Sequence, residues 1–429
     1  MKPAFKAKNE PGPKQEKMKF VADLHIHSKY SRATSRDMDI PNLTRWAKLK
    51  GVGLLATGDF THHLWLQELK QYLKPLPGKG LYVYDDITFI LSAEISSIFS
   101  QNGKTYRVHN LILAPSLEIV EEVNRMLSFH GNIASDGRPI LGMSCYFLAQ
   151  ELFKISQELM LIPAHVWTPW FSVFGSQSGF DSLQEAFGEY TDKITALETG
   201  LSSDPAMNWM ISGLDKFSLV SNSDSHSPSR IGREANIFDC ELDYWEIKRV
   251  LEEKDKSKFL YTIEFFPEEG KYHYDGHRKC QACLRPEETR KRQGLCPVCG
   301  RPITKGVLYR VEELADRPYG FCPDSAIDYK SLVPLDEIIA EVKGVGKTSK
   351  AVEKAYLDLV QSFGPELYIL AEMPVQELME KLPESIGQGI VNVREKKIKA
   401  LPGYDGEYGK IKVFSPDKER RNAGQLKLF

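Results

Sequence analysis

The sequence predicts an α/β fold built around a barrel, and three observations lead to this prediction. Strand-like runs alternate with helix-compatible segments between residues 18 and 267. Metal-ligand residues recur within these runs, at their ends or just past them. Two Cys-x2-Cys pairs then mark a small separate module, which a helix-rich region follows. Alternation favours parallel strands, and seven of them in about 250 residues fit a closed barrel better than an open sheet, although the pattern alone leaves both open.

The elements follow in order along the chain. The strand-like runs are Phe20–His27, Gly53–Asp59, Ile87–Ile95, Tyr106–Ala114, Met160–Val166, Ile194–Thr199 and Phe217–Ser223, and helix-compatible segments include Asn42–Lys50, Leu117–Ser128 and Ser182–Tyr190. We therefore expect five parts: a flexible polar arm (1–17), the barrel (18–267), a zinc module (268–322), a helical region (323–414) and a basic tail (415–429).

Charge is distributed unevenly along the 429 residues, although the net charge is only −2. Residues 271–310 carry ten Lys/Arg against three Asp/Glu, and residues 391–429 carry ten against five. The rest is net acidic, which suggests chemistry in the first part and a polyanion bound by the basic parts. No apolar run reaches the ~18 residues of a membrane span, and the polar N-terminus lacks a signal-peptide stretch. The sequence predicts a cytoplasmic protein without a membrane partner.

The first strand-like run ends in His25-Ile-His27, which places both imidazoles on one face of a strand. Later runs bring further ligand-type residues, namely Asp59, Glu94, His109, His165, Glu198, Asp224 and His226. In an α/β barrel the C-terminal strand ends converge, so this set predicts a metal centre there. Two or three divalent ions suit phosphate-ester hydrolysis, and nitrogen and oxygen ligands leave Zn²⁺, Mn²⁺, Fe²⁺ and Mg²⁺ as candidates.

These motifs, in this order, resemble the polymerase-and-histidinol-phosphatase (PHP) superfamily, whose fold is a distorted seven-stranded barrel. The resemblance rests on Asp23-Leu-His25-Ile-His27-Ser28, Thr57-Gly-Asp59, Ser92-Ala-Glu94, Arg107-Val-His109, Pro163-Ala-His165 and Ser223-Asp224-Ser-His226. It implies a first metal held by His25, His27, Glu94 and Asp224, which are also the expected catalytic residues. Glu94 would bridge to a second metal held with His109 and His165. Asp59, in place of the histidine of many members, would hold a third with His226, whereas Glu198 is open as a ligand, a supporting carboxylate or a proton shuttle.

The spacing Cys280-x2-Cys283-x12-Cys296-x2-Cys299 is typical of a closed tetrahedral site with four thiolates and one structural Zn²⁺. Aromatic and basic residues surround it: Tyr272, Tyr274, Arg278, Lys279, Arg285, Arg290, Lys291 and Arg292. Basic side chains beside aromatic ones suit phosphate contacts and base stacking, and the alternative is an ordinary solvated surface.

The Gly344-Val-Gly346-Lys347 segment lies between two helical runs. It is not a Walker A loop, because the first glycine of that motif would fall at Glu341. It fits a helix-hairpin-helix, in which backbone N–H groups at a helix start contact a DNA phosphate, and the alternative is an ordinary glycine turn.

The whole arrangement resembles the endonuclease Q family over residues 18–414, including Pro402-Gly-Tyr404-Asp-Gly-Glu-Tyr408. The resemblance implies a metal-dependent endonuclease that cuts DNA 5′ of hypoxanthine, uracil, xanthine or an abasic site, leaving 3′-hydroxyl and 5′-phosphate ends. A phosphoesterase of small metabolites and a DNA-binding accessory with a degenerate barrel are the alternatives. Trp167-Thr-Pro-Trp170-Phe171 would line the DNA path or pack over the barrel mouth, and Gln425–Phe429 resembles a short sliding-clamp-binding peptide.

Overall fold

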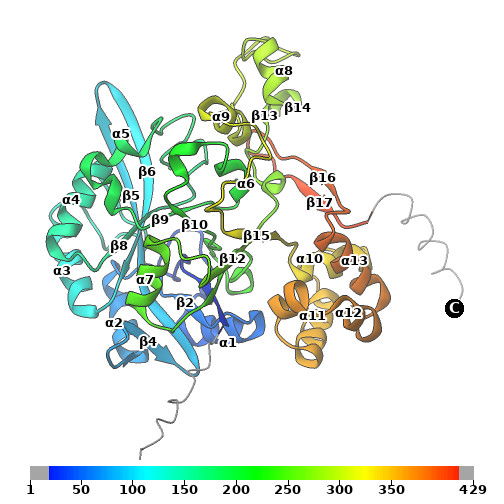
Figure 1. Ribbon diagram of the computed structural model, residues 1–429, viewed down its shortest axis with the longest axis horizontal. Coiled ribbons are helices and arrows are strands. Elements are labelled where there is room, and N and C mark those ends of the chain that lie inside the picture. The colour runs from blue at the N-terminus through cyan, green and yellow to red at the C-terminus, as the bar shows by residue number, and fades with distance from the viewer. Residues whose placement is uncertain (1–18, 415–429) are drawn as a thin grey trace, which may run out of the picture.

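The computed structural model describes residues 19–414, and its centre is a ring of seven strands (Figure 1). The predicted arm and the tail with Gln425–Phe429 lie outside these residues. In ring order the strands are β1 (Lys19–Asp23), β2 (Leu54–Ala56), β5 (Ile87–Gln101), β6 (Lys104–Ala114), β8 (Met160–Pro163), β9 (Ala196–Glu198) and β10 (Ser218–Val220). The predicted mixed α/β barrel is therefore confirmed.

Backbone hydrogen bonds close the ring between strands that form no regular ladder. The N–H of Thr195 donates to the carbonyl of Leu161 at 3.1 Å, which joins β9 to β8. Past the end of β1, a parallel bridge pairs Ile26 with Ser225, and the N–H of His27 donates to the Ser225 carbonyl at 3.0 Å. This last contact brings the segment with His25 and His27 beside the segment with Asp224.

The strand directions differ from the parallel arrangement that alternation favours. β1, β2 and β5 are parallel, but β5 and β6 form a long antiparallel hairpin, and β6 and β8 are also antiparallel. The hairpin turns at Asn102-Gly103, where both residues have positive φ (51° and 77°). Asn-Gly is the preferred pair for such a turn, because its backbone twist matches that of the flanking strands. The Asn-Gly pair therefore indicated this turn in the sequence itself.

Further strands widen the sheet beyond the ring. β11 (Ala235–Asp239) and β12 (Phe259–Glu264) add antiparallel strands beside β1, and β15 (Asp328–Ser331) pairs with β12 in parallel. The short strands β3 (Lys74–Leu76), β4 (Leu81–Tyr84) and β7 (Ile140–Leu141) pair on the β5 side. Because β15 lies beyond the zinc module in sequence, the chain returns to the barrel before it enters the helical region.

Helices surround the barrel (Figure 1), and side-chain caps start several of them. They are α1 (Ile40–Lys50), α2 (His63–Tyr72), α3 (Leu117–Ser128), α4 (Cys145–Ile155), α5 (Leu183–Phe187), α6 (Pro205–Asn208) and α7 (Tyr244–Glu252). The side chains of Asp39, Ser116, Ser144 and Asp243 accept hydrogen bonds from first-turn N–H groups. No helix among residues 19–414 is long and apolar enough to cross a membrane.

Two smaller parts project from the barrel (Figure 1). The zinc module contains β13 (Asp275–His277), β14 (Ala282–Leu284), α8 (Pro286–Lys291) and α9 (Val307–Leu314). The helical region contains α10 (Leu335–Lys343), α11 (Lys350–Phe363), the π-helical turn Tyr368–Glu372, α12 (Val375–Lys381) and α13 (Glu384–Arg394). A hairpin of β16 (Lys399–Leu401) and β17 (Lys410–Lys412) runs from the helical region back toward the module.

The tip of this hairpin is attached to the linker between barrel and zinc module. The N–H of Gly403 donates to the Glu268 carbonyl at 2.8 Å, and the N–H of Gly406 donates to the Lys271 carbonyl at 2.9 Å. The N–H of Arg278 donates to Asp405 at 2.6 Å. The hairpin therefore fixes the module to the barrel.

Glu366 joins the helical region to the barrel as a buried carboxylate. It forms an ion pair with Lys50 of α1 and accepts from the Leu335 N–H at 3.0 Å and the Tyr356 hydroxyl at 2.8 Å. Both charged side chains are 3% exposed.

Replacing Glu366 by alanine leaves Lys50 buried without a partner, so we expect the free energy of unfolding to fall by about 3–5 kcal/mol. Urea unfolding followed by tryptophan fluorescence measures it, since Trp46 lies 6.0 Å from the Tyr356 ring. Glu353→Ala, at an exposed position of α11, is the matched control. Equal transitions in the two variants would contradict the expectation.

Candidate metal centre

Two groups of ligand atoms meet at one mouth of the barrel. His25, His27, Glu94 and Asp224 form the first, and Glu94, His109 and His165 form the second. Within each group the ligand atoms lie within 4.8 Å of one another. These residues come from the segments after β1, β8 and β10 and from the middles of β5 and β6, so the converging segments assemble the centre.

The two histidines that follow β1 are held in the tautomer that a metal requires. His25 Nδ1 lies 3.0 Å from Glu198 Oε1, and His27 Nδ1 lies 3.0 Å from Asp59 Oδ1. Because a carboxylate can only accept, each Nδ1 carries the proton and each Nε2 keeps its lone pair. Both Nε2 atoms and Asp224 Oδ1 are buried without a hydrogen-bond partner within the described chain. Orphaned acceptors that face one another fit a bound cation.

Glu94 lies between the two groups and presents one oxygen to each. Oε2 is 3.2 Å from His27 Nε2, whereas Oε1 is 2.7 Å from His109 Nδ1 and 3.1 Å from His165 Nε2. The carboxylate is fully buried. This geometry suits a carboxylate that bridges two metal ions.

The pKa shifts of the carboxylates and of His109 favour the forms that bind metals, whereas neighbouring carboxylates outweigh burial and raise the pKa of His25, His27 and His165. Burial alone raises the pKa of Glu94, but the neighbouring His109 imidazole and Arg138 guanidinium outweigh it and hold that pKa well below the usual value. Burial likewise raises the pKa of Asp224, but the neighbouring His27 and His25 imidazoles bring it well below the usual value. Burial lowers the pKa of His109 to about 4, so this imidazole is neutral at neutral pH. Ionised carboxylates and neutral imidazoles are the forms that bind metals.

Three residues of the centre adopt left-handed backbone, with φ of 50° at Asp59, 32° at His165 and 44° at Asp224. Such conformations cost on the order of 1–3 kcal/mol each and persist where the surroundings fix them. Their concentration here indicates that the fold maintains strain in order to aim these side chains.

Asp59 and His226 as holders of a third metal stay a prediction, and both side chains have partners within the described residues. Both Asp59 oxygens are occupied, Oδ1 by His27 and Oδ2 by the Ser28 N–H at 2.6 Å and the Ser31 hydroxyl at 2.9 Å. His226 Nδ1 donates to the Asp224 carbonyl at 2.9 Å. No third group of ligand atoms forms around them within residues 19–414. Asp59 instead orients His27, as Glu198 orients His25.

The zinc module gathers His277, Cys280, Cys296 and Cys299 rather than four cysteines. Cys299 Sγ lies 3.4 Å from His277 Nδ1. Cys283 lies outside this group because it sits in the middle of β14, opposite Gly276. Its neighbours Ala282 and Leu284 are buried, so strand alternation turns Cys283 to the exposed opposite face. Three thiolates and one imidazole therefore gather within the described residues, a donor set that suits Zn²⁺, and Cys283 as a fourth thiolate ligand stays a prediction.

A cleft of about 780 Å³ opens over the metal centre. Four centre residues line it (His109, His165, Asp224, His226), as do three aromatic side chains (Trp170, Tyr272, Tyr408) and four cations (Arg138, Arg230, Arg233, Lys271). A second hollow of about 700 Å³ shares Arg230, Arg233 and Tyr408 with the cleft and reaches Lys347 and Lys410. The two adjoin and form one depression from the metal centre to the helical region.

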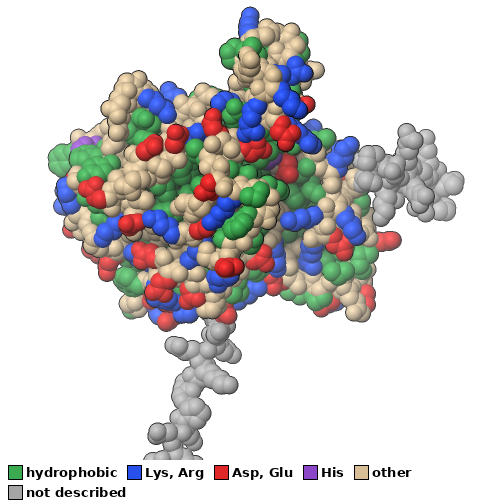
Figure 2. Space-filling view, turned by 45° about the horizontal axis from the view of Figure 1, so that its top comes forward, with side chains coloured by type: hydrophobic (Ala, Val, Ile, Leu, Met, Phe, Trp, Pro, Cys, Tyr) green, Lys and Arg blue, Asp and Glu red, His purple; other side chains and the backbone are tan. Residues whose placement is uncertain are grey.

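The sequence-predicted DNA contacts lie in different places. Tyr272 lines the cleft, and Lys347 lines the second hollow while pairing with Glu337 at 2.7 Å. Gly344 and Gly346 are exposed between α10 and α11. The others belong to the zinc module, where Lys and Arg side chains stand on the projecting surface (Figure 2): Tyr274, Arg278, Lys279, Arg285, Arg290, Lys291 and Arg292. Of these, Tyr274 is half-buried and bonded to Gly403, and Arg290 pairs with Glu312.

Sequence reasoning missed Arg138 and did not assign a role to Tyr408. Arg138 contacts Glu94 at 3.0 Å, but it lies in an irregular segment with no motif to mark it. Tyr408 stands at the hairpin tip, 69% exposed, with the Lys271 ammonium 4.6 Å from its ring centroid. The expected aromatic loop is divided: Trp170 and Phe171 line the cleft, whereas Trp167 is buried.

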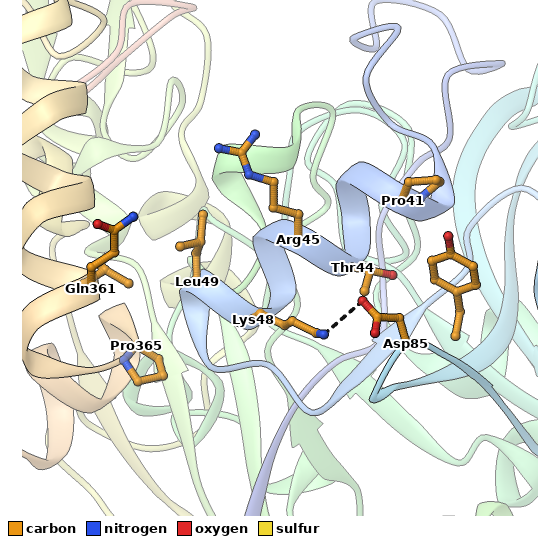
Figure 3. A pocket seen from close by; sticks show the side chains of 10 residues that line it. Pro41, Thr44, Arg45, Lys48, Leu49, Asp85, Gln361 and Pro365 are labelled. Atoms are coloured by element: carbon orange, nitrogen blue, oxygen red, sulfur yellow. Dashed lines mark hydrogen bonds and ion pairs between the residues drawn. The ribbon is translucent and has the colours of Figure 1, made fainter.

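A hollow of about 520 Å³ between α1 and α11 contains none of these residues (Figure 3). Its wall includes Arg45 and a pair between Lys48 and Asp85 at 3.0 Å.

Comparisons with known proteins relate the whole chain to others. A family model described as the MJ0043 C-terminal domain matches residues 334–397. The uncharacterised protein YqxK of Bacillus subtilis is 30% identical over 413 residues, which cover 92% of this chain and 99% of YqxK. The uncharacterised protein MJ0043 of Methanocaldococcus jannaschii is 35% identical over 260 residues, 59% of this chain. The match spans about a third (32%) of MJ0043.

Two solved structures are similar over almost their full length. The crystal structure of the lesion-specific endonuclease PfuEndoQ from Pyrococcus furiosus has a TM-score of 0.83 at 32% identity, covering 95% of this chain and 99% of that one. A crystal structure of endonuclease Q in complex with a 27-mer duplex substrate, with an abasic lesion at the active site, has a TM-score of 0.82 at 33% identity. That match covers 93% of this chain and 97% of the other.

Proposed function

The chain belongs to the endonuclease Q family, and on that premise we propose that it is a metal-dependent DNA repair endonuclease. It cuts the phosphodiester 5′ of a deaminated base or an abasic site and leaves 3′-hydroxyl and 5′-phosphate ends. The observation that carries the proposal is Glu94, a buried carboxylate shared by two ligand groups whose other members His109, His165 and Asp224 line the cleft.

Two divalent ions, when bound, supply an activated water and polarise the phosphoryl oxygens. The donor set fits them, because the orphaned atoms of His25, His27 and Asp224 face one another. The first ion would be held by these three residues with Glu94, and the second by Glu94, His109 and His165. Glu198 and Asp59 keep the imidazoles of His25 and His27 correctly turned.

The remaining residues of the cleft bind and orient DNA. Arg233 and Lys271 offer positive charge to the phosphates, whereas Arg230 is paired with Asp336. Trp170 and Tyr272 offer ring faces to unstacked bases. A damaged base pairs poorly, so extruding it costs less than extruding a normal one. We assign the structural Zn²⁺ to His277, Cys280, Cys296 and Cys299, with the basic surface of the module directed to the duplex.

The test is incubation of the purified protein with Mn²⁺ or Mg²⁺ and a duplex that carries one deoxyinosine, uracil or abasic site. We expect a nick 5′ of the lesion, mapped on a sequencing gel, and none in the undamaged duplex. Asp224→Ala should abolish cutting but retain binding in a gel-shift assay. Turnover of a phosphate monoester such as p-nitrophenyl phosphate, without any nick, would favour a metabolite phosphoesterase instead.

A further inference from the structure

The segment Asp136-Gly137-Arg138 occupies the space beside Asp59. A Cβ on Gly137 would lie 2.3 Å from Asp59 Oδ2 and 2.4 Å from the Ser31 hydroxyl, so no side chain fits there. The N–H of Gly137 donates to the Tyr30 carbonyl at 3.1 Å, and the Thr61 hydroxyl donates to the Gly137 carbonyl at 3.1 Å. The backbone is thus fixed on both sides and packs directly against Asp59, one of the two residues expected to hold a third metal.

This packing places the next side chain, Arg138, at the metal centre. Its Nη1 lies 3.0 Å from Glu94 Oε2, the oxygen that faces the first ligand group. The side chain is 28% exposed and lines the 780 Å³ cleft with Asp224 and His226. The backbone of the segment is anchored further by the Ser96 N–H, which donates to the Pro139 carbonyl at 3.0 Å.

We propose that Arg138 contacts the scissile phosphate and supplies, as a fixed cation, the positive charge that a third metal would otherwise bring. The proposal rests on the phosphodiesterase function proposed above. Guanidinium keeps its charge at any working pH and matches phosphate oxygens in a bidentate geometry. When substrate enters, the guanidinium exchanges Glu94 Oε2 for a non-bridging oxygen of the phosphate, so it needs to move only within the cleft.

The reaction it assists is balanced without any bond to Arg138. Water adds its oxygen to phosphorus, the bond from phosphorus to the 3′-oxygen breaks, and the leaving oxygen takes up a proton. Negative charge accumulates on the non-bridging oxygens during this exchange. A preorganised cation beside these oxygens interacts more strongly with the transition state than with the ground state. Its removal should therefore lower mainly kcat.

Arg138→Met should lower kcat by about 10²–10³-fold, the usual result of removing one preorganised donor, with less effect on KM. Arg138→Lys keeps the charge but not the planar guanidinium. Its kcat should lie between that of the unaltered protein and that of Arg138→Met. The bound catalytic metal, measured by elemental analysis, should equal that of the unaltered protein. Arg45→Met removes a cation from the hollow of Figure 3 and should change nothing. Unchanged kcat in Arg138→Met, or loss of metal from it, overturns the proposal.

A methylphosphonate at the scissile position, which removes one negative oxygen, tests the contact itself. If Arg138 touches that oxygen, the substitution slows the unaltered protein more than it slows Arg138→Met. Equal slowing in both proteins overturns the contact. If the unaltered protein cuts no lesion duplex, the proposed function fails. Arg138 is then tested separately, by measuring how strongly inorganic phosphate inhibits the hydrolysis of bis-p-nitrophenyl phosphate. In that assay phosphate should inhibit Arg138→Met less than the unaltered protein at unchanged metal content, and equal inhibition of the two proteins overturns the assignment.

Gly137 positions the arginine, and a matched pair of glycines tests this. Gly137→Ala pushes the segment away from Asp59, whereas a Cβ at Gly142 meets nothing within 4 Å. We expect Gly137→Ala to reproduce the kcat loss of Arg138→Met and Gly142→Ala to leave kcat unchanged. Combining Gly137→Ala with Arg138→Met should add little to either change. Full additivity in the double variant contradicts a positioning role.

Discussion

Replacing Glu94 by glutamine is expected to abolish both lesion-directed cleavage and metal binding. The amide offers one oxygen where the carboxylate offers two, and it cannot neutralise two ions, so both ligand groups lose their shared member. Loss of a whole catalytic unit typically lowers kcat by about 10⁴-fold or more. Elemental analysis of the purified variant and single-turnover cleavage of an abasic duplex measure the two effects.

Glu198→Gln is the informative comparison for Glu94→Gln. Glu198 touches the centre through His25 Nδ1 at 3.0 Å and is in neither ligand group. Losing such a supporting partner typically costs about 10–100-fold in metal affinity or activity. If Glu198→Gln proved as damaging as Glu94→Gln, Glu198 would be a direct ligand and the two-group description would be wrong.

The second large effect is expected in the zinc module. Cys296→Ser should remove the bound Zn²⁺ and unfold the module, because a structural Zn²⁺ contributes roughly 10–16 kcal/mol of binding free energy in small metal-dependent folds. DNA affinity should fall strongly, whereas the metals of the barrel should stay. A thiolate-sensitive zinc assay and gel-shift titration measure both.

Cys283→Ser provides the matched control, since Cys283 also belongs to a Cys-x2-Cys pair but is turned away from the cluster. We expect it to retain zinc and DNA binding, and His277→Ala to lose both. Retention of zinc by His277→Ala together with its loss from Cys283→Ser would restore the four-cysteine interpretation.

Most of the metal centre was legible in the sequence because strand ends converge in a barrel whatever the loops do. The grouping of His25, His27, Glu94 and Asp224 around one metal came from the resemblance to the PHP superfamily, and the structure brings their ligand atoms together. The contacts of Asp59 could not be predicted from the sequence. They depend on hydrogen bonds from Ser28 and Ser31 and on the close approach of Gly137, which is distant in sequence.

The module shows a different limit of sequence reasoning. Spacing identified two cysteine pairs, but spacing does not say on which face of a strand a side chain emerges. Pairing of β13 with β14 decides that for Cys283 and brings His277 to the cluster instead. For the antiparallel β5–β6 hairpin the local signal was sufficient, because Asn102-Gly103 indicates a tight turn between two antiparallel strands. The alternation of strands and helices predicted parallel strands instead.

The attachment of Asp405 to Arg278 has a consequence for how the protein is made. These partners are 127 residues apart. The linker between barrel and zinc module therefore leaves the ribosome long before residues 402–409, which contact it. All residues of the two ligand groups precede the linker, so they are synthesised while the linker is still without these contacts. The linker between barrel and zinc module therefore gains its contacts with residues 402–409 only after the four helices of the helical region have been made.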